Sequence, residues 1–337
     1  MPEQLQWGIV GTGGIAADFA QSLLESERCR VVNVVGSSAE KARAFAARWS
    51  LPKSSVALEE LLADPAVDAV YVASPHPAHQ QHALAAIAAR KAVLCEKPLC
   101  VDAASSEVLI AAARKQGVFL MEAFMYRCHP LLRELLARLA AGEIGALRHV
   151  RADFGFRAPR DPRGRLFNPE LGGGGILDVG GYPISFARLI AGVAAGTELA
   201  EPLSLRGTGH IGPSGVDELA SAVLRFDDGF TAQVTCAVFH DVGTQAVVYG
   251  EAGKVVLPNP WIPEGNRHSR ETSFVLERAG KAPEEVRIRT PLATYAIEAE
   301  LVYETLPRLE APYPAMSWSD SLGNMRALDA WRAELKE

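Results

Sequence analysis

The chain has 337 residues, of which 48% are hydrophobic and 22% charged, with a formal net charge of -6. This length favours two globular domains, and the acidic balance argues against a nucleic-acid partner, which would need a broad basic surface. The five cysteines form no CxxC pair and no zinc-like spacing, which predicts buried reduced thiols and a cytoplasmic protein. We find no export signal and no apolar run of bilayer length, so a membrane partner is not expected.

The first part of the chain alternates short apolar segments with helical patterns. Strands are expected at 5–10, 31–35, 69–73, 92–95 and 118–121, and helices at 15–24, from 38 toward 49, at 79–89 and at 103–116. These strands lack polar alternation, as strands buried on both faces do. Residues 1–125 are therefore predicted to form a Rossmann domain, a doubly wound parallel sheet that binds NAD(P).

The pattern changes after about residue 126. One more helix is expected at 129–141, followed by long alternating segments at 147–156, 218–226, 230–239 and 245–249. The turn Asp227-Asp228-Gly229 indicates a hairpin, because glycine accepts the positive φ that such turns need. Residues 126–337 are therefore predicted to form an α+β domain for substrate binding and oligomerisation, with an open, mainly antiparallel sheet.

A glycine-rich turn, Gly11-Thr12-Gly13-Gly14-Ile15-Ala16, directly follows the first strand. In the GxGxx(G/A) pattern the first glycine permits a tight turn, the second lets the backbone approach a pyrophosphate, and the small third residue allows close helix packing. Glycine turns are common in α/β proteins. The place of this one between the first strand and the first helix favours a dinucleotide site over a plain turn.

The end of the second strand bears on cofactor preference. Sites that prefer NAD carry an acidic residue there for the adenosine ribose, whereas this chain has Gly36, Ser37 and Ser38, with Lys41 soon after. Hydroxyls and a cation suit a 2′-phosphate, so NADP is the expected cofactor and NAD the second choice. In the alternative interpretation these are ordinary surface residues at a helix start.

Two further segments hold groups that could do chemistry. Lys97 follows the strand at 92–95, at the sheet edge where ligands of such folds bind; a solvated surface lysine is the alternative.

In the segment from Leu171 to Pro183, Asp178 and Tyr182 would share one face if the chain there is helical. A tyrosine acts as an acid or base near neutrality when a nearby cation such as Lys97 favours the phenolate. A core tyrosine bonded to Asp178, beside a flexible glycine loop, is equally consistent with this segment.

Together these motifs resemble the glucose-fructose oxidoreductase, inositol dehydrogenase and MocA (Gfo/Idh/MocA) family over essentially the whole chain. The branch most similar is that of the trans-dihydrodiol dehydrogenases and NADP-dependent D-xylose 1-dehydrogenases. The motifs are GTGGIA at Gly11 to Ala16, SPHPAH at Ser74 to His79, EKP at Glu96 to Pro98, MEAFMYRCHP at Met121 to Pro130 and GGGGILDVGGYP at Gly172 to Pro183.

The resemblance implies a role for each matching residue. Tyr182 would be the general acid/base, Lys97 its electrostatic partner and Asp178 a substrate orienter, while Arg127 would help to close the site. The cofactor-binding residues would be Gly11, Thr12, Gly13, Gly14, Ile15, Ser37, Ser38, Lys41, Ser74, Pro75, His76, His79, Glu96, Lys97 and Arg127.

Two departures from the family pattern concern specificity. Members that bind NADP firmly carry arginine at the second-strand turn, where this chain has Ser37, and some dihydrodiol enzymes have a large aromatic residue at the position of Met125. The first departure bears on cofactor preference and the second on the substrate pocket.

The expected reaction is hydride transfer between the nicotinamide and a hydroxyl or carbonyl carbon of a sugar, cyclic polyol or diol. The alternative is a non-catalytic dinucleotide-binding sensor of the same fold. A metal-dependent hydrolase is disfavoured because His76, His79 and His82 have helical spacing without an adjacent carboxylate or cysteine, and no metal is expected. Association through an exposed sheet face predicts a homodimer or a larger even assembly.

Overall fold

The computed structural model describes residues 3–262 and 268–335, which form two compact units. The first unit comprises residues 1–129 and 291–321, and the second comprises 130–290 and 322–337. Part of the C-terminal region therefore packs into the first unit. The division of functions between 1–125 and 126–337 stays a prediction.

The first unit contains a six-stranded parallel sheet in the order β3-β2-β1-β4-β5-β6. This is the Rossmann order, and it confirms the predicted fold of the first part of the chain. The order reverses between β1 and β4, where such sheets open a crevice for ligands. The strands are β1 (Leu5–Val10), β2 (Cys29–Val35), β3 (Lys53–Ser55), β4 (Ala69–Val72), β5 (Ala92–Glu96) and β6 (Leu120–Ala123).

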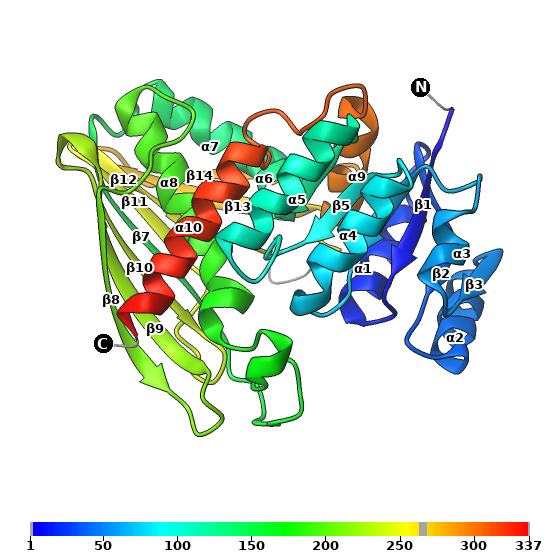
Figure 1. The fold of residues 1–337 in the computed structure, drawn as a ribbon. Helices are drawn as coiled ribbons and strands as arrows, with labels where there is room; N and C mark the ends of the chain where they lie inside the picture. Colours follow the sequence, from blue (N-terminus) through cyan, green and yellow to red (C-terminus); the bar gives the residue numbers. More distant parts are fainter. Residues whose placement is uncertain (1–2, 263–267, 336–337) are drawn as a thin grey trace. The chain divides into compact units, whose positions relative to one another are not determined.

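Helices pack on this sheet, with α4 beside α5 and α1 beside α9 (Figure 1). Side chains cap two of these helices at their N-termini. The hydroxyl of Ser38 accepts the amide of Lys41 at the start of α2, and the carboxylate of Asp102 accepts the amide of Ser105 at the start of α5. The helices are α1 (Gly14–Leu23), α2 (Ala39–Trp49), α3 (Leu58–Leu62), η1 (His76–Ala78), α4 (His79–Ala88), α5 (Ala103–Gln116), α6 (Met125–Cys128) and α9 (Thr294–Thr305).

The second unit contains an eight-stranded sheet in the order β14-β13-β12-β11-β7-β10-β9-β8. Every neighbouring pair is antiparallel except β7 and β10, so the predicted mainly antiparallel sheet is confirmed. The predicted hairpin at residues 227–229 joins β9 to β10. The strands are β7 (Leu147–Gly155), β8 (Ser204–Ile211), β9 (Asp217–Arg225), β10 (Thr231–Ala237), β11 (Ala246–Gly250), β12 (Gly253–Leu257), β13 (Glu271–Arg278) and β14 (Glu284–Arg289).

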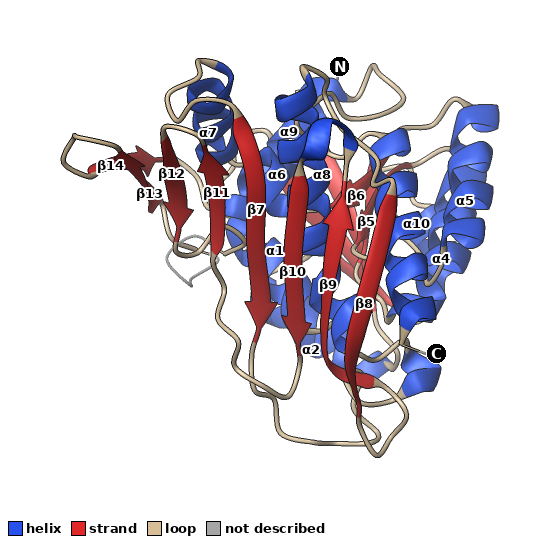
Figure 2. Cartoon of the chain, turned by 90° about the vertical axis from the view of Figure 1, so that its left-hand side faces the viewer, coloured by secondary structure: helices blue, strands red, loops and turns tan. Residues whose placement is uncertain are grey.

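One face of this sheet is covered by helices. Helix α8 (Gly181–Ala195) packs on β7 and β10, and Figure 2 shows it behind the sheet with α7 (Pro130–Ala140). Two short turns, η2 (Pro169–Leu171) and the π-helical turn η3 (Ile176–Gly180), lead into α8. The last helix, α10 (Trp318–Glu334), starts in the first unit and continues in the second.

The segment that ends in α8 corrects the expectation that the chain has no apolar run of bilayer length. The helical stretch Pro169–Ala195 is long and apolar enough to cross a membrane, with a mean hydropathy of 1.3. However, 94% of its most apolar window is buried inside the structure. Such a stretch is weak evidence for a membrane span, because the core helix of a soluble protein has the same length and composition.

Candidate active site

The glycine turn after β1 is where the sequence predicts a pyrophosphate site. Gly11 has a φ of +119°, and a Cβ atom there would lie 2.5 Å from the carbonyl oxygen of Ala73, so the position requires glycine. At Gly13 and Gly14 no described heavy atom lies within 4 Å of where a Cβ would be. Among the described residues no side chain caps α1, which is compatible with a pyrophosphate accepting from its first amides.

The turn after β2 is where the sequence predicts the site of the adenosine ribose. Ser37 and Lys41 are exposed, whereas the hydroxyl of Ser38 accepts the amide of Lys41 at 3.3 Å and so serves the helix cap. Glu40, which the sequence analysis did not weigh, is also exposed in the first turn of α2. A 2′-phosphate here would meet one cation and one anion on adjacent residues.

His79 lies inside the first unit, with no exposed surface. Its Nδ1 is 2.8 Å from the carbonyl oxygen of Pro98 and its Nε2 is 2.8 Å from that of Ser74. Burial lowers the pKa of His79 to about 4, against the opposing effect of the two carbonyls. Because both carbonyl oxygens can only accept, a neutral ring donates to one of them at a time. We therefore propose that His79 positions Ser74 and the Lys97-Pro98 segment rather than contacting the cofactor itself.

Other predicted residues lie around this histidine. His76 is partly exposed in η1 after Pro75, its ring centroid is 5.6 Å from that of His79, and the hydroxyl of Ser74 lies 2.9 Å from Nδ1 of His82. Ser74, which follows β4, is therefore held at its carbonyl oxygen by His79 and at its hydroxyl by His82.

Glu96 and Lys97 end β5 at the same edge of the sheet. Glu96 is buried, accepts the hydroxyl of Tyr71, and accepts the backbone amide of Lys97 at 3.2 Å. Burial and the charge of Glu96 raise the pKa of Tyr71 well above its ordinary value, so this phenol stays protonated and acts as the donor. Lys97 itself is partly exposed. The geometry gives Glu96 the role of fixing the backbone that carries Lys97.

Arg127 is buried completely, which does not fit its expected part in closing the site. Its guanidinium donates to Asp320 at 2.6 Å, to the carbonyl oxygen of Pro314 at 2.6 Å and to the sulfur of Met316 at 3.4 Å. Burial is the largest single effect and acts to lower the pKa of Arg127, but the combined effects of Asp320 and Tyr126 exceed it, so the net shift of the pKa is upward. We propose that Arg127 anchors the segment before α10 instead of binding a cofactor.

The glycine cluster of the second unit forms a tight turn rather than a flexible loop. A Cβ at Gly173 would lie within 3.0 Å of three backbone carbonyl oxygens, and Gly174 has a φ of +112°, which favours glycine. The chain then enters η3 and α8, which confirms that Asp178 and Tyr182 lie on helical backbone. Because η3 is a π-helical turn, its residues do not keep the α-helical spacing of four.

Asp178 is buried and paired with a residue that the sequence analysis missed. One guanidinium nitrogen of Arg165 donates to its carboxylate at 2.6 Å, and Arg165 is exposed on its other side. Arg165 lies in a loop with Arg157, Arg160 and Arg163, and this density of cations next to the glycine cluster was the signal that could have identified it. The pair fixes the direction of the Asp178 carboxylate.

Tyr182 lies in an aromatic cluster. Its ring centroid is 5.1 Å from that of Phe154 on β7 and 6.0 Å from that of Trp261. Trp261 also packs edge-on against Phe186 of α8. Only 6% of Tyr182 is exposed, so these contacts restrict its ring to few orientations. Lys97 belongs to the first unit and Tyr182 to the second, and their action on one substrate stays a prediction.

Models of known families match both parts of the chain. Residues 5–124 match the oxidoreductase family with an NAD-binding Rossmann fold, and residues 132–256 match the GFO/IDH/MocA C-terminal domain. A trans-1,2-dihydrobenzene-1,2-diol dehydrogenase from Mus musculus is 39% identical over 77% of this chain and 76% of its own length. The chain belongs to the Gfo/Idh/MocA oxidoreductase family.

Two further proteins are similar to this chain over nearly its whole length. A trans-1,2-dihydrobenzene-1,2-diol dehydrogenase from Xenopus tropicalis is 34% identical and covers 94% of this chain and 93% of its own. A 3-ketoreductase from Actinomadura kijaniata, solved with NADP and TDP-benzene, has a TM-score of 0.86 at 26% identity, with 98% of each chain covered. The family resemblance expected from the sequence is confirmed, and the chain is an NAD(P)-binding oxidoreductase.

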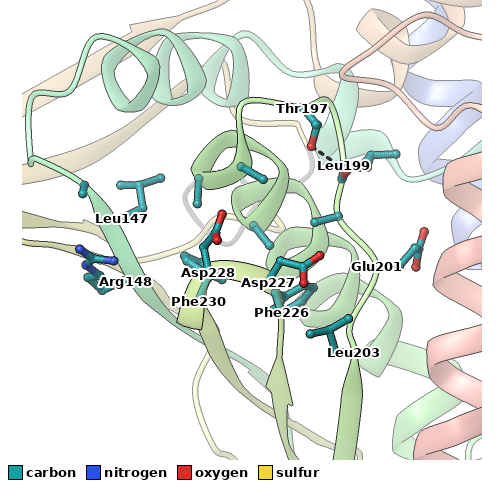
Figure 3. Close-up of a pocket in the computed structure, with 15 residues that line it drawn as sticks. Leu147, Arg148, Thr197, Leu199, Glu201, Leu203, Phe226, Asp227, Asp228 and Phe230 are labelled. Carbon is teal, nitrogen blue, oxygen red and sulfur yellow. Dashed lines mark hydrogen bonds between the residues drawn. The ribbon is translucent and has the colours of Figure 1, made fainter.

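A cavity of about 490 Å³ lies elsewhere in this Gfo/Idh/MocA protein (Figure 3). Its lining includes Ala194 and Ala195 at the C-terminal end of α8, whereas Tyr182 lies at the N-terminal end of that helix. The described lining of the cavity also includes Leu147, Phe226, Asp227 and Phe230 and none of the predicted site residues. Within the described residues, no three His, Cys, Asp or Glu side chains are grouped as metal ligands. That no metal takes part stays a prediction.

Proposed function

We propose that this oxidoreductase moves a hydride between NADP and a hydroxyl or carbonyl carbon of a sugar, cyclic polyol or diol. The observation that supports the cofactor class most directly is the β1–α1 turn, where glycines and uncapped amides leave open space for a pyrophosphate. The substrate class is supported by the similarity to a trans-1,2-dihydrobenzene-1,2-diol dehydrogenase and to a 3-ketoreductase, whose names indicate a dihydrodiol and a keto group.

Three side chains carry the proposed chemistry. When bound, the nicotinamide accepts or supplies the hydride. The phenol of Tyr182 removes the proton of the substrate hydroxyl in oxidation and returns it in reduction, and the ammonium of Lys97 favours the phenolate that this requires. Asp178, held by Arg165, accepts a hydrogen bond from a second substrate hydroxyl and so orients the ring.

A substrate screen tests the proposed function. Purified protein with NADP or NAD would be given aldoses, inositols and cyclic diols, and the absorbance of the reduced cofactor would be recorded. We expect turnover of at least one polyhydroxylated substrate, faster with NADP. Binding of NADPH without turnover across the panel would favour a sensor of the same fold.

The preference for NADP is expected to depend on Lys41. Replacing Lys41 by alanine removes the cation nearest to the expected 2′-phosphate, so the Kd for NADPH should rise about tenfold while that for NADH changes less than about twofold. Fluorescence titration with each cofactor measures both values. Lys115→Ala, at an exposed cation on α5, is the control. Equal changes for the two cofactors would contradict the assignment of Lys41 to the phosphate.

We further propose a cytoplasmic homodimer, or a larger even assembly, formed through the sheet face opposite α8. Val223 of β9 is 55% exposed on that face. Among the neighbouring outward positions, Gln233 is exposed and Ser221 and Thr235 are partly exposed. Light scattering at micromolar concentration is expected to give an even multiple of the chain mass, and Val223→Arg to lower it, because a buried unpaired charge opposes association. A monomeric mass for the unmodified protein would contradict this.

A further inference from the structure

The glycine turn before α8 is held by Asp217, the first residue of β9. One carboxylate oxygen accepts the backbone amide of Ile176 at 2.6 Å, and the amides of Gly175 and of Asp217 itself also donate to this group. Ile176 starts η3, the turn that contains Asp178 and leads into Tyr182. A single side chain from the sheet therefore binds the amides at the point where this helical segment begins.

The glycines next to this contact leave room for that carboxylate. A Cβ at Gly174 would collide with one carboxylate oxygen of Asp217, and a Cβ at Gly175 would lie 3.3 Å from the other. At Gly175 the same Cβ would also lie 3.4 Å from the sulfur of Cys236. Two of the four consecutive glycines are thus explained by the approach of Asp217 rather than by a need for flexibility.

We propose that Asp217 is a positioning residue of the active site, whose ionised carboxylate holds the turn that carries Asp178 and Tyr182 in its catalytic geometry. The inference rests on the proposed function of those two residues. Neutralising Asp217 weakens a charge-assisted hydrogen bond to Ile176, which is about twice as strong as a neutral one. The turn then loosens, and small displacements of reacting groups are costly to turnover.

This arrangement makes the positioning depend on pH. Burial raises the pKa of Asp217 to about 6, against the opposing effects of the amides of Ile176 and Gly175 and of the Arg332 charge. The carboxylate is therefore ionised at neutral pH and becomes protonated as the pH falls through about 6. Because the pKa is raised above the ordinary value for aspartate, the ionised form costs folding stability, and removing its charge is not expected to unfold the protein.

The charged and titratable groups that face Asp217 come from three elements. On η3, Asp178 is paired with Arg165, and α10 contributes Arg332. On β10, burial and then the charge of Asp217 raise the pKa of Cys236 well above its ordinary value, so this thiol stays neutral.

The test compares kcat of Asp217→Asn with kcat of the unmodified enzyme over a range of pH. Because both proteins share every other ionisation, the ratio of the two values reports on Asp217 alone. We expect the variant to be slower by roughly tenfold to a hundredfold at about pH 8 and nearly equal to the unmodified enzyme at about pH 5, where both side chains are neutral. The Kd for NADPH should stay the same, because the cofactor turn lies in the other unit.

Control variants separate positioning from general damage. Asp228→Asn, at an exposed acid in the 227–229 turn, should give a ratio of one at every pH. Gly175→Ala, at a φ of -66° that alanine also adopts, places a methyl group 3.3 Å from a carboxylate oxygen of Asp217 and should also lower kcat at about pH 8, even if Asp217→Asn does not fold.

Two results would overturn the role of Asp217. One is a ratio of the two kcat values that does not change with pH. The other is a kcat of Asp217→Asn equal to that of the unmodified enzyme at about pH 8. Neither outcome resembles failure of the proposed function, in which the unmodified enzyme turns over no polyhydroxylated substrate.

Discussion

Replacing Tyr182 by phenylalanine is expected to lower kcat by about 10²–10⁴-fold, the usual contribution of a positioned general acid or base. The change removes the hydroxyl alone, and a phenylalanine ring can keep the contacts with Phe154 and Trp261. The fold and the cofactor turn should therefore be preserved, and the Kd for NADPH should change by less than about twofold. Steady-state rates and fluorescence titration measure the two quantities.

Tyr249→Phe is the matched control for this variant. Tyr249 lies on β11 and is 37% exposed, outside the proposed site. It should keep nearly all activity, since exposed substitutions of this kind change little. Near-normal turnover by the Tyr182 variant would show that another group transfers the proton.

The second large effect is expected on stability. Arg127→Met leaves the Asp320 carboxylate buried without its partner, and breaking a buried ion pair in this way costs about 3–5 kcal/mol of unfolding free energy. Two further contacts, to Pro314 and Met316, are lost with it. Urea unfolding followed by tryptophan fluorescence reports the change, because Trp318 lies close by in the chain and donates to the carbonyl oxygen of Leu120.

An exposed ion pair of the same unit provides the control. Arg28 and Glu304 are paired at 2.7 Å, but about half of each side chain is exposed. Arg28→Met should cost less than about 1 kcal/mol, as exposed pairs do. Equal losses for the two variants would argue against an anchoring role for Arg127.

The regular part of the fold was predictable from local patterns. The strands and helices of the first unit follow buried apolar runs and helical periodicity, and α5 matches its expected bounds, 103–116. The next strand starts at Leu120 rather than at 118, because Gly117 ends the helix and the amide of Val118 donates to the carbonyl oxygen of Ala113. Short or weakly patterned elements, such as β3 and α10, were not predicted.

The candidate site was predictable in its motifs but not in its supporting contacts. The glycine turn and the strand-end Lys97 could be located because their chemistry is local in sequence. The burial of Arg127 could not, because its partner Asp320 lies 193 positions away. Asp217 is likewise 41 positions from Ile176 and follows no motif. Pairings between distant segments depend on tertiary packing, which residue spacing alone does not encode.

The central proposal is that Tyr182 and Lys97 act as one catalytic unit. The most direct test is a double-mutant cycle with Tyr182→Phe, Lys97→Met and the double variant, in which kcat is measured at saturating NADP and substrate. Residues that act together are not additive, so we expect large losses in both single variants and no more than about a further tenfold loss in the double variant. Losses that multiply in the double variant, or normal turnover in either single variant, would contradict the claim.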